Sequence, residues 1–220
     1  MISVAIDGPA GAGKSSISKA LAKKLEFIYV DTGALYRAIG LKFLRLGIDT
    51  KLECDIPAIL KTTKVDIKFI NGEQRVFLDD EDVSELIRTP DASMMASAAS
   101  AKPPVREFLL EMQRKNAREN NVIMDGRDIG TVVLPNATVK IFLTASVEKR
   151  AYRRYLELQE KGNSSTYEEV LEDMKVRDYN DSNRAIAPLK PAEDSVLVDT
   201  SELNLEESIQ ALYNIIKEKM

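Results

Sequence analysis

The sequence predicts an α/β fold with a doubly wound, five-stranded parallel sheet. Two observations carry this prediction: short apolar runs recur along the chain, and stretches with helical spacing separate them. Such runs are too short for helices and suit parallel strands that are buried on both faces. The five expected strands are residues 2–6, 27–30, 122–124, 139–143 and 196–198.

A glycine-rich segment directly follows the first expected strand and leads into an expected helix over residues 17–25. It fits the phosphate-binding pattern GxxxxGK followed by Ser or Thr, in the required order of strand, loop and helix. Glycines let backbone N–H groups turn inward, and the helix adds a partial positive charge, so this P-loop suits a triphosphate. Lys14 is expected to reach the β- and γ-phosphates and Ser15 to ligate Mg²⁺; the alternative is a plain turn with a solvated lysine. The expected phosphate-binding residues are Gly8, Pro9, Ala10, Gly11, Ala12, Gly13, Lys14, Ser15 and Ser16.

Composition and charge exclude several functions. The chain has 220 residues, no histidine, one cysteine and a net charge of -4. Without histidine, Ser-His-Asp or Cys-His catalysis and His-ligated zinc are excluded, so the chemistry depends on carboxylates, Lys, Arg and an oxygen-liganded cation. The mildly acidic balance gives no support for nucleic-acid binding. Cys54 is the only cysteine, which is compatible with a reducing compartment. The first strand is expected to start at Ile2, which leaves no room for a signal peptide, and no apolar run is long enough to span a membrane. We therefore expect a cytoplasmic protein.

The segment after the second strand is expected to form a helix over residues 32–46. Thr32 is placed to cap this helix, and Arg37 lies in its first turns. A satisfied cap and a surface arginine are the plain alternative for these two residues.

An inserted subdomain is expected between residues 65 and 83. Apolar residues alternate on both sides of Asn71-Gly72, which predicts a β-hairpin that a parallel wound sheet cannot contain. Helices are expected over residues 87–101 and from the Pro103-Pro104 pair to about Asn120.

Carboxylates follow four of the expected strands: Asp7, Asp31, Asp125 and Asp199. In such sheets, ligands collect at the carboxyl ends of the strands. The third strand leads into residues 125–130, DGRDIG, where two carboxylates and a guanidinium between glycines make a poor core and a good ligand site. The alternative is an ordinary loop with a local Asp–Arg pair.

A helix–loop–helix is expected after the fourth strand, with a first arm to about Lys161, a break at residues 162–165 and a second arm from about Tyr167. Basic residues cluster over 149–154. A solvated helix face is one interpretation; a lid that closes over a triphosphate is the other. The C-terminal helix, with Asn204 as cap and Glu207 three residues later, is expected to be structural.

Several cations are distant in sequence, yet most lie near strand ends or on the segments around them. Hydrolysis of a nucleotide needs only water, so this many cations predict a second phosphorylated molecule and phosphoryl transfer between two substrates. The cations are Lys14, Arg37, Arg106, Arg127, Arg177 and Arg184.

Together these segments resemble the bacterial cytidylate kinases, nucleoside monophosphate (NMP) kinases that make CDP or dCDP from CMP or dCMP and ATP. The resemblance covers essentially the whole chain: IDGPAGAGKSS, DTGALYR, the hairpin, ASAASAKPPVR, DGRDIGTVV and RDYNDSNRAIAPL occur in order. It implies one P-loop kinase domain over residues 1–220, with an inserted β-hairpin NMP-binding subdomain at about 32–106 and a helical lid at about 150–180. It also implies CMP and dCMP as substrates, ATP as phosphoryl donor and Mg²⁺ as cofactor.

The resemblance implies roles for individual residues. Ser97, Arg106 and Asp128 would read the cytosine edge, with Asp128 accepting from the N4 amino group that uracil lacks. Arg37, Arg127 and Arg184 would hold the CMP phosphate, and Asp181, supported by Arg177, would meet the ribose. Thr32 and Tyr36 complete the CMP site, Tyr36 lying against the base. The implied catalytic residues are Lys14, Arg127, Arg184, Arg150 and Arg154, with Arg153 as a further lid candidate, and Asp125 would bind Mg²⁺ through water.

Two other functions stay open. One is a P-loop kinase for another acceptor, such as UMP, AMP or shikimate, against which the hairpin and the three base-reading residues argue. The other is a nucleotide-dependent switch that a partner protein reads, but the sequence has no NKxD motif and no long disordered tail. With no large apolar surface stripe evident, a monomer is expected.

Overall fold

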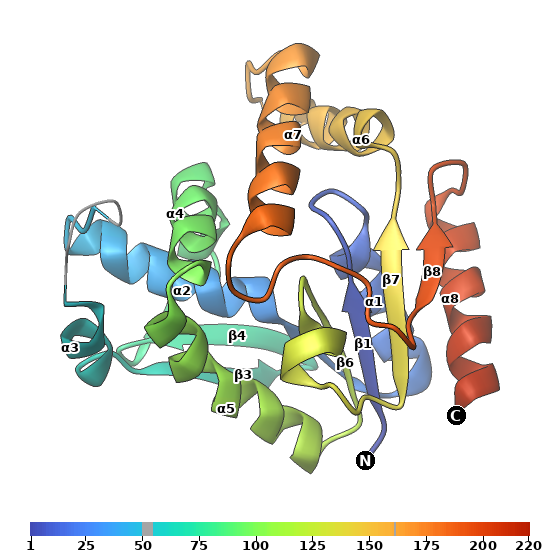
Figure 1. Cartoon of the computed structure of the whole chain (residues 1–220), viewed down its shortest axis with the longest axis horizontal. Coiled ribbons are helices and arrows are strands. Elements are labelled where there is room, and N and C mark those ends of the chain that lie inside the picture. Colours follow the sequence, from blue (N-terminus) through green and yellow to red (C-terminus); the bar gives the residue numbers. More distant parts are fainter. Residues whose placement is uncertain (50–54, 161) are drawn as a thin grey trace.

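The computed structural model describes residues 1–49, 55–160 and 162–220 and confirms the predicted parallel sheet (Figure 1). Five parallel strands lie in the order β2-β6-β1-β7-β8, so the first strand of the chain is central. All five coincide with apolar runs of the sequence. Their bounds are β1 Ser3–Asp7, β2 Ile28–Asp31, β6 Val122–Gly126, β7 Val139–Thr144 and β8 Val196–Asp199.

Different elements cover the two faces of this sheet, because successive strand residues point to opposite sides. Val4 and Ile6 of β1 belong to a core shared with α1 (Lys14–Leu25) and α8 (Leu205–Lys219). Ala5 belongs to a second core, shared with a π-helical turn, here called the π-turn (Ile129–Val133), and with residues of α5 (Pro103–Glu119). Elements on both faces make the sheet doubly wound, as predicted.

The predicted hairpin forms a second, antiparallel sheet. Asn71 and Gly72 join β3 (Val65–Ile70) to β4 (Glu73–Leu78), and their φ angles of 53° and 79° fit the two-residue turn that Asn-Gly favours. A third, short strand that the sequence did not predict, β5 (Glu81–Asp82), pairs with β4.

This small sheet has its own hydrophobic core beside the main sheet (Figure 1). The core is shared with α2 (Thr32–Arg45), α3 (Ile56–Lys61) and α4 (Pro90–Ser100). The helix expected over residues 87–101 is divided into a 3₁₀ turn, Leu86–Arg88, and α4, because Pro90 has no N–H donor and suits the first helical position.

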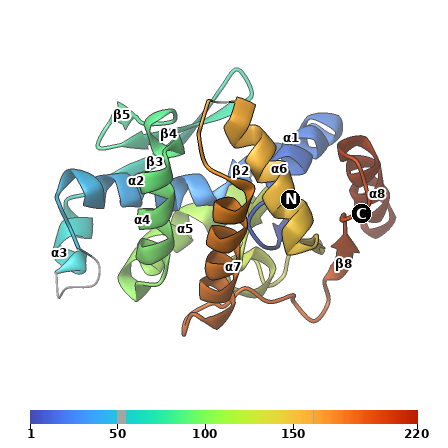
Figure 2. The ribbon, with the colours of Figure 1, turned by 90° about the horizontal axis from the view of Figure 1, so that it is seen from above.

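Two helices, α6 (Val147–Glu160) and α7 (Tyr167–Asn183), stand beyond the carboxyl ends of the strands, as Figures 1 and 2 show. Residue 161, the expected end of the first arm, lies outside the described residues, as do residues 50–54 of the expected insert. α8 begins with the predicted capping box of Asn204 and Glu207. Across the described ranges, no helix combines the length and apolar character needed to cross a membrane.

Candidate active site

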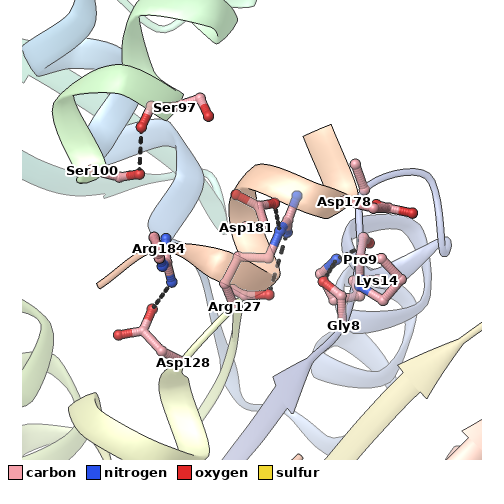
Figure 3. A network of polar contacts seen from close by, with 12 residues as sticks. Gly8, Pro9, Lys14, Ser97, Ser100, Arg127, Asp128, Asp178, Asp181 and Arg184 are labelled. Atoms are coloured by element: carbon pink, nitrogen blue, oxygen red, sulfur yellow. Dashed lines mark hydrogen bonds and ion pairs between the residues drawn. The ribbon is translucent and has the colours of Figure 1, made fainter. Parts of the chain in front are cut away.

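The loop between β1 and α1 takes a shape that depends on glycine. At Gly8, φ is 149° and an added Cβ would lie 1.9 Å from the Leu143 carbonyl oxygen. Lys14, at the start of α1, is buried, and its Nζ donates to the carbonyls of Gly8 at 2.7 Å and Pro9 at 2.6 Å (Figure 3). Burial, and secondly the charge of Arg127, lowers the pKa of Lys14 below its ordinary value. The loop therefore holds a desolvated ammonium group beside the N-terminus of a helix.

Asp125, near the carboxyl end of β6, faces Ser15 of α1. Its Oδ2 accepts from the Ser15 hydroxyl at 3.0 Å, and its Oδ1 accepts from the Tyr29 hydroxyl at 2.9 Å. Within the described residues, no group of three or more His, Cys, Asp or Glu side chains could hold a metal ion. Mg²⁺ at a nucleotide site usually takes only one or two protein ligands beside phosphates and water. The oxygen pair of Ser15 and Asp125 fits that requirement.

Tyr29 is a residue of this site that the sequence did not predict. The available signal is weak: a tyrosine in a strand that is buried needs a partner for its hydroxyl group. The partner could not be predicted from the sequence. Only the parallel pairing of β2 with β6, in which Asp31 lies opposite Asp125, brings the Asp125 carboxylate within reach of Tyr29.

The buried Asp125 makes stability depend on pH. Burial, and then the nearby Asp31, raises the pKa of Asp125 from 3.8 to about 6. The folded protein thus binds this proton more tightly than the unfolded chain, so Asp125 lowers the free energy of unfolding as pH rises from about 4 to 6. As pH rises from about 4 to 6, we expect the free energy of unfolding of Asp125→Asn, measured with urea, to increase by up to about 3 kcal/mol relative to that of wild type. Asp91→Asn, which replaces an exposed carboxylate, is the control. If the free energies of unfolding of Asp125→Asn and wild type differed by the same amount at every pH, the pKa shift of Asp125 would be contradicted.

A second buried carboxylate, Asp128, lies directly before the π-turn. It forms an ion pair with Arg106 of α5, and Arg184 Nη2 lies 3.4 Å from its Oδ1 (Figure 3). The Arg106 guanidinium also lies 5.7 Å from the centre of the Tyr36 ring. Burial raises the pKa of Asp128 despite the charges of Arg106 and Arg184. Three of the predicted CMP-site residues, Tyr36, Arg106 and Asp128, are thus brought together with Arg184.

A cavity of about 360 Å³ opens beside these residues. Tyr36 and Arg106 line it together with Gln113, Val132 and Ala187. Its walls join α2, α5, the π-turn and the segment that follows α7. A small planar group therefore has space next to Tyr36 and Arg106, the residue that pairs with Asp128.

Ser97 of α4 lies apart from this pair. Its carbonyl oxygen accepts from the Ser100 hydroxyl at 2.8 Å, and Figure 3 shows both serines away from Asp128. Across the described ranges, no hydrogen bond joins the Ser97 side chain to Arg106 or Asp128. Arg106 instead donates to the Ser100 carbonyl at 3.2 Å.

Several guanidinium groups surround one carboxylate above the phosphate loop. Arg127 Nε donates to Asp181 Oδ2 at 2.8 Å. Burial opposes ionisation of Asp181, but the charges of Arg127 and Arg177 hold its pKa below the usual value. Burial, and secondly Arg127, lowers the pKa of Arg177 to about 10. Within the described part of the chain, the buried Nε atoms of Arg37 and Arg177 have no hydrogen-bond partner. These donors and the excess of positive charge suit an anion such as phosphate.

Thr32 is not the cap of α2, so that prediction is wrong. The Asp31 carboxylate accepts from the Ala34 amide at 2.9 Å and also pairs with Arg37 at 2.8 Å. Thr32 is the first helical residue instead, and its hydroxyl donates to the Asp125 carbonyl at 2.7 Å. A carboxylate one residue earlier in the chain takes the capping position because Asp is among the strongest caps.

The three arginines that are predicted to belong to a lid have different surroundings. Arg150 is buried, donates to the Ala10 carbonyl of the phosphate loop at 3.0 Å and pairs with Asp178 of α7 at 2.6 Å. Arg153 donates to the Thr200 carbonyl at 2.7 Å, and Arg154 pairs with Glu157 on the surface. Of the three, Arg150 alone has a hydrogen bond to the loop among the described contacts. Asp178 of α7, whose ion pair with Arg150 joins α6 and α7, was not predicted, because only the fold brings it to Arg150.

Comparisons with known proteins identify the family of the chain. The family model described as Cytidylate kinase matches residues 4–218. A cytidylate kinase from Caldicellulosiruptor bescii is 51% identical over 100% of this chain and 99% of its own length. A cytidylate kinase from Caldanaerobacter subterraneus is 53% identical over 98% of this chain and 95% of its own length.

Solved structures show the fold. A shikimate kinase from Bacteroides thetaiotaomicron has a TM-score of 0.51 at 15% identity, with 98% of each chain covered. An uncharacterized protein from Eubacterium ventriosum has a TM-score of 0.54 at 13% identity, covering 99% of this chain and 98% of its own. At such identities the similarity extends to the architecture alone, whereas the family model matches residues 4–218 of the sequence. The chain belongs to the cytidylate kinase family.

Proposed function

We propose that this protein transfers the γ-phosphoryl group of ATP to CMP and dCMP, producing ADP and CDP or dCDP. The observation that carries the proposal is the Asp128 carboxylate, buried between Arg106 and Arg184 on the acceptor side of a phosphate loop. Family membership over nearly the whole chain supports the same activity. The protein is therefore a nucleoside monophosphate kinase whose acceptor base is cytosine.

The donor site is proposed to be residues 8–16, with Lys14 bound to the β- and γ-phosphates of ATP. Phosphate oxygens would replace the Gly8 and Pro9 carbonyls that accept from Lys14 Nζ. Ser15 would ligate Mg²⁺ and Asp125 would bind it through water, in keeping with their 3.0 Å hydrogen bond. The metal would supply neutralising charge between the β- and γ-phosphates.

The acceptor base is proposed to bind in the cavity beside Tyr36. Cytosine has one amino donor, N4, and two acceptors, N3 and O2, on its pairing edge. Asp128 supplies the acceptor that N4 needs, and Arg106 supplies donors for the other two atoms. Ser97 would complete this recognition, which requires α4 to approach the core, because its side chain has no bond to the pair in the described structure.

The acceptor phosphate is proposed to bind among Arg37, Arg127 and Arg184, with Thr32 at the N-terminus of α2 beside them. The unpartnered Nε atom of Arg37 supports this assignment. Asp181 and Arg177 would contact the ribose, and Asp181 would then exchange part of its bond to Arg127 for a sugar hydroxyl.

In the transfer step, an oxygen of the CMP phosphate forms the new bond to the γ-phosphorus as the bond to the ADP oxygen breaks. The acceptor phosphate is largely ionised at neutral pH, so no side chain has to act as a base. Lys14, Arg127 and Arg184 stabilise the charge on the transferring group, and Arg150 and Arg154 are proposed to join them when the lid closes. Closure would also exclude water and so suppress hydrolysis.

The organisation of the chain supports this scheme. We propose that residues 32–106 form the NMP-binding insert and that α6 and α7 are the lid; each part has a hydrophobic cluster of its own. A monomer in the cytoplasm remains a prediction.

A coupled ADP-release assay with ATP and Mg²⁺ tests the function directly. We expect fast turnover with CMP and dCMP, and at least about 100-fold lower kcat/KM with UMP, because Asp128 has no donor for the uracil O4. AMP and GMP should be poor acceptors as well. ADP release that needs no acceptor would favour an ATPase or a nucleotide switch, and preference for another acceptor would overturn the assignment of Asp128.

A further inference from the structure

Asp7 is a buried carboxylate that the reaction scheme leaves without a role. It is the last residue of the central strand β1, pairs in register with Gly126 of β6 and Phe142 of β7, and directly precedes the phosphate loop. Its side chain is only 4% exposed. Across the described residues, Asp7 forms no hydrogen bond or ion pair with a lysine or arginine.

The partners of Asp7 are two backbone amides on the acceptor side. Oδ1 accepts from the Ile129 N–H at 2.8 Å, and Oδ2 accepts from the Gly130 N–H at 2.7 Å. These amides belong to the first two residues of the π-turn, immediately after Asp128. One carboxylate thus fixes the backbone behind the proposed base-reading residue to the strand that carries the phosphate loop.

The chemistry of this contact requires a carboxylate. Two adjacent N–H donors need two acceptor atoms, and an amide side chain offers one acceptor and one donor. The two amides favour the ionised form, but burial outweighs them and the negative charge of Asp128 adds to its effect, so the pKa of Asp7 is raised to about 6. Burying an ionised carboxylate costs free energy. The presence of Asp7 is therefore explained more simply by the backbone geometry that it holds than by a gain in stability.

We propose that Asp7 is a positioning residue that sets the placement of Asp128 and Arg127 relative to the phosphate loop and so couples acceptor selection to the donor site. The inference rests on the role proposed for Asp128 in reading cytosine. A displacement of about 1 Å of positioned groups can reduce a rate about 100-fold, so two hydrogen bonds at this junction are sufficient to matter.

The test compares Asp7→Asn with a variant that removes hydrogen bonds from the C-terminal end of the same π-turn. Arg114 of α5 donates to the carbonyls of Val132 and Val133 at 3.0 Å each and, in the described part of the chain, makes no hydrogen bond or ion pair with β1. Arg114→Met is therefore the matched control for a purely structural role. Each variant is measured for kcat/KM with CMP and UMP, for ATP affinity, and for thermal unfolding.

We expect Asp7→Asn to lower the CMP-to-UMP ratio of kcat/KM at least about tenfold, with ATP affinity changed less than about threefold. Arg114→Met should keep that ratio within about threefold at a similar loss of stability. An unchanged ratio in Asp7→Asn, or equal losses in both variants, would overturn the proposal. If wild type itself does not prefer CMP, the failure lies in the proposed function and not in Asp7.

A second variant covers the case in which Asp7→Asn does not fold. A Cβ added at Gly130 would lie 3.2 Å from Lys140 Cδ, a tight approach, and 3.4 Å from Asp7 Oδ2, so Gly130→Ala fills the space around the contact, chiefly against Lys140, without removing a side chain. We expect it to lower the CMP-to-UMP ratio in the same direction by about threefold or more. A ratio equal to that of wild type in Gly130→Ala would likewise overturn the proposal.

Discussion

Replacing Lys14 by methionine is expected to lower kcat for CMP phosphorylation by about 1,000-fold. The charge of Lys14 would lie between the β- and γ-phosphates, where negative charge is redistributed in the transition state. Methionine has a similar length and no charge, so it keeps the packing of the loop while removing that stabilisation. The measurement is kcat in the coupled ADP-release assay at saturating ATP and CMP.

The fold should tolerate this change. Burial and the charge of Arg127 already lower the pKa of Lys14, which means that its charged form is unfavourable in the folded protein. Lys23→Met, an exposed substitution on the same helix, is the matched control and should keep kcat within about twofold. A Lys14→Met enzyme within about tenfold of wild type would show that the ammonium group does not act on the transferring phosphoryl group.

How far the sequence predicts this molecule depends on the range of the interactions. The five strands of the parallel sheet, the Asn71-Gly72 turn and the Asn204 cap follow from neighbouring residues, and the structure confirms all three. The cap of α2 was assigned to the wrong one of two adjacent residues, because Asp31 and Thr32 can both cap a helix and only the fold gives Thr32 another partner.

The side-chain partners in the site could not be predicted in this way. Arg150 and Asp178 are 28 residues apart, and they meet because α6 and α7 pack against each other. Asp7 and Gly130 are 123 residues apart, and they meet because β1 and β6 are neighbours in the sheet. The residues of the site were predictable by chemical type, whereas their pairing depends on the order of the strands.

Replacing Asp128 by asparagine is expected to lower the CMP-to-UMP ratio of kcat/KM by about 100-fold. With cytosine, the carboxylate accepts from N4, and this bond is lost or weakened when one of its oxygens becomes an amino group. With uracil, the new amino group can donate to O4 and the remaining oxygen can accept from N3–H. Turnover of CMP should therefore fall while turnover of UMP rises, which a competition assay with both acceptors measures directly.

The stability of Asp128→Asn separates recognition from folding. Removing one partner of a buried ion pair usually costs about 3–5 kcal/mol, because the other charge is left alone. Here the pKa of Asp128 is raised, since burial outweighs the attraction of Arg106 and Arg184, so the ionised carboxylate adds little net stability. We therefore expect the free energy of unfolding to change by less than about 2 kcal/mol and the KM for ATP by less than about threefold. An unchanged CMP-to-UMP ratio would show that Asp128 does not read the base, and a large loss of stability would show that its main role is to neutralise Arg106.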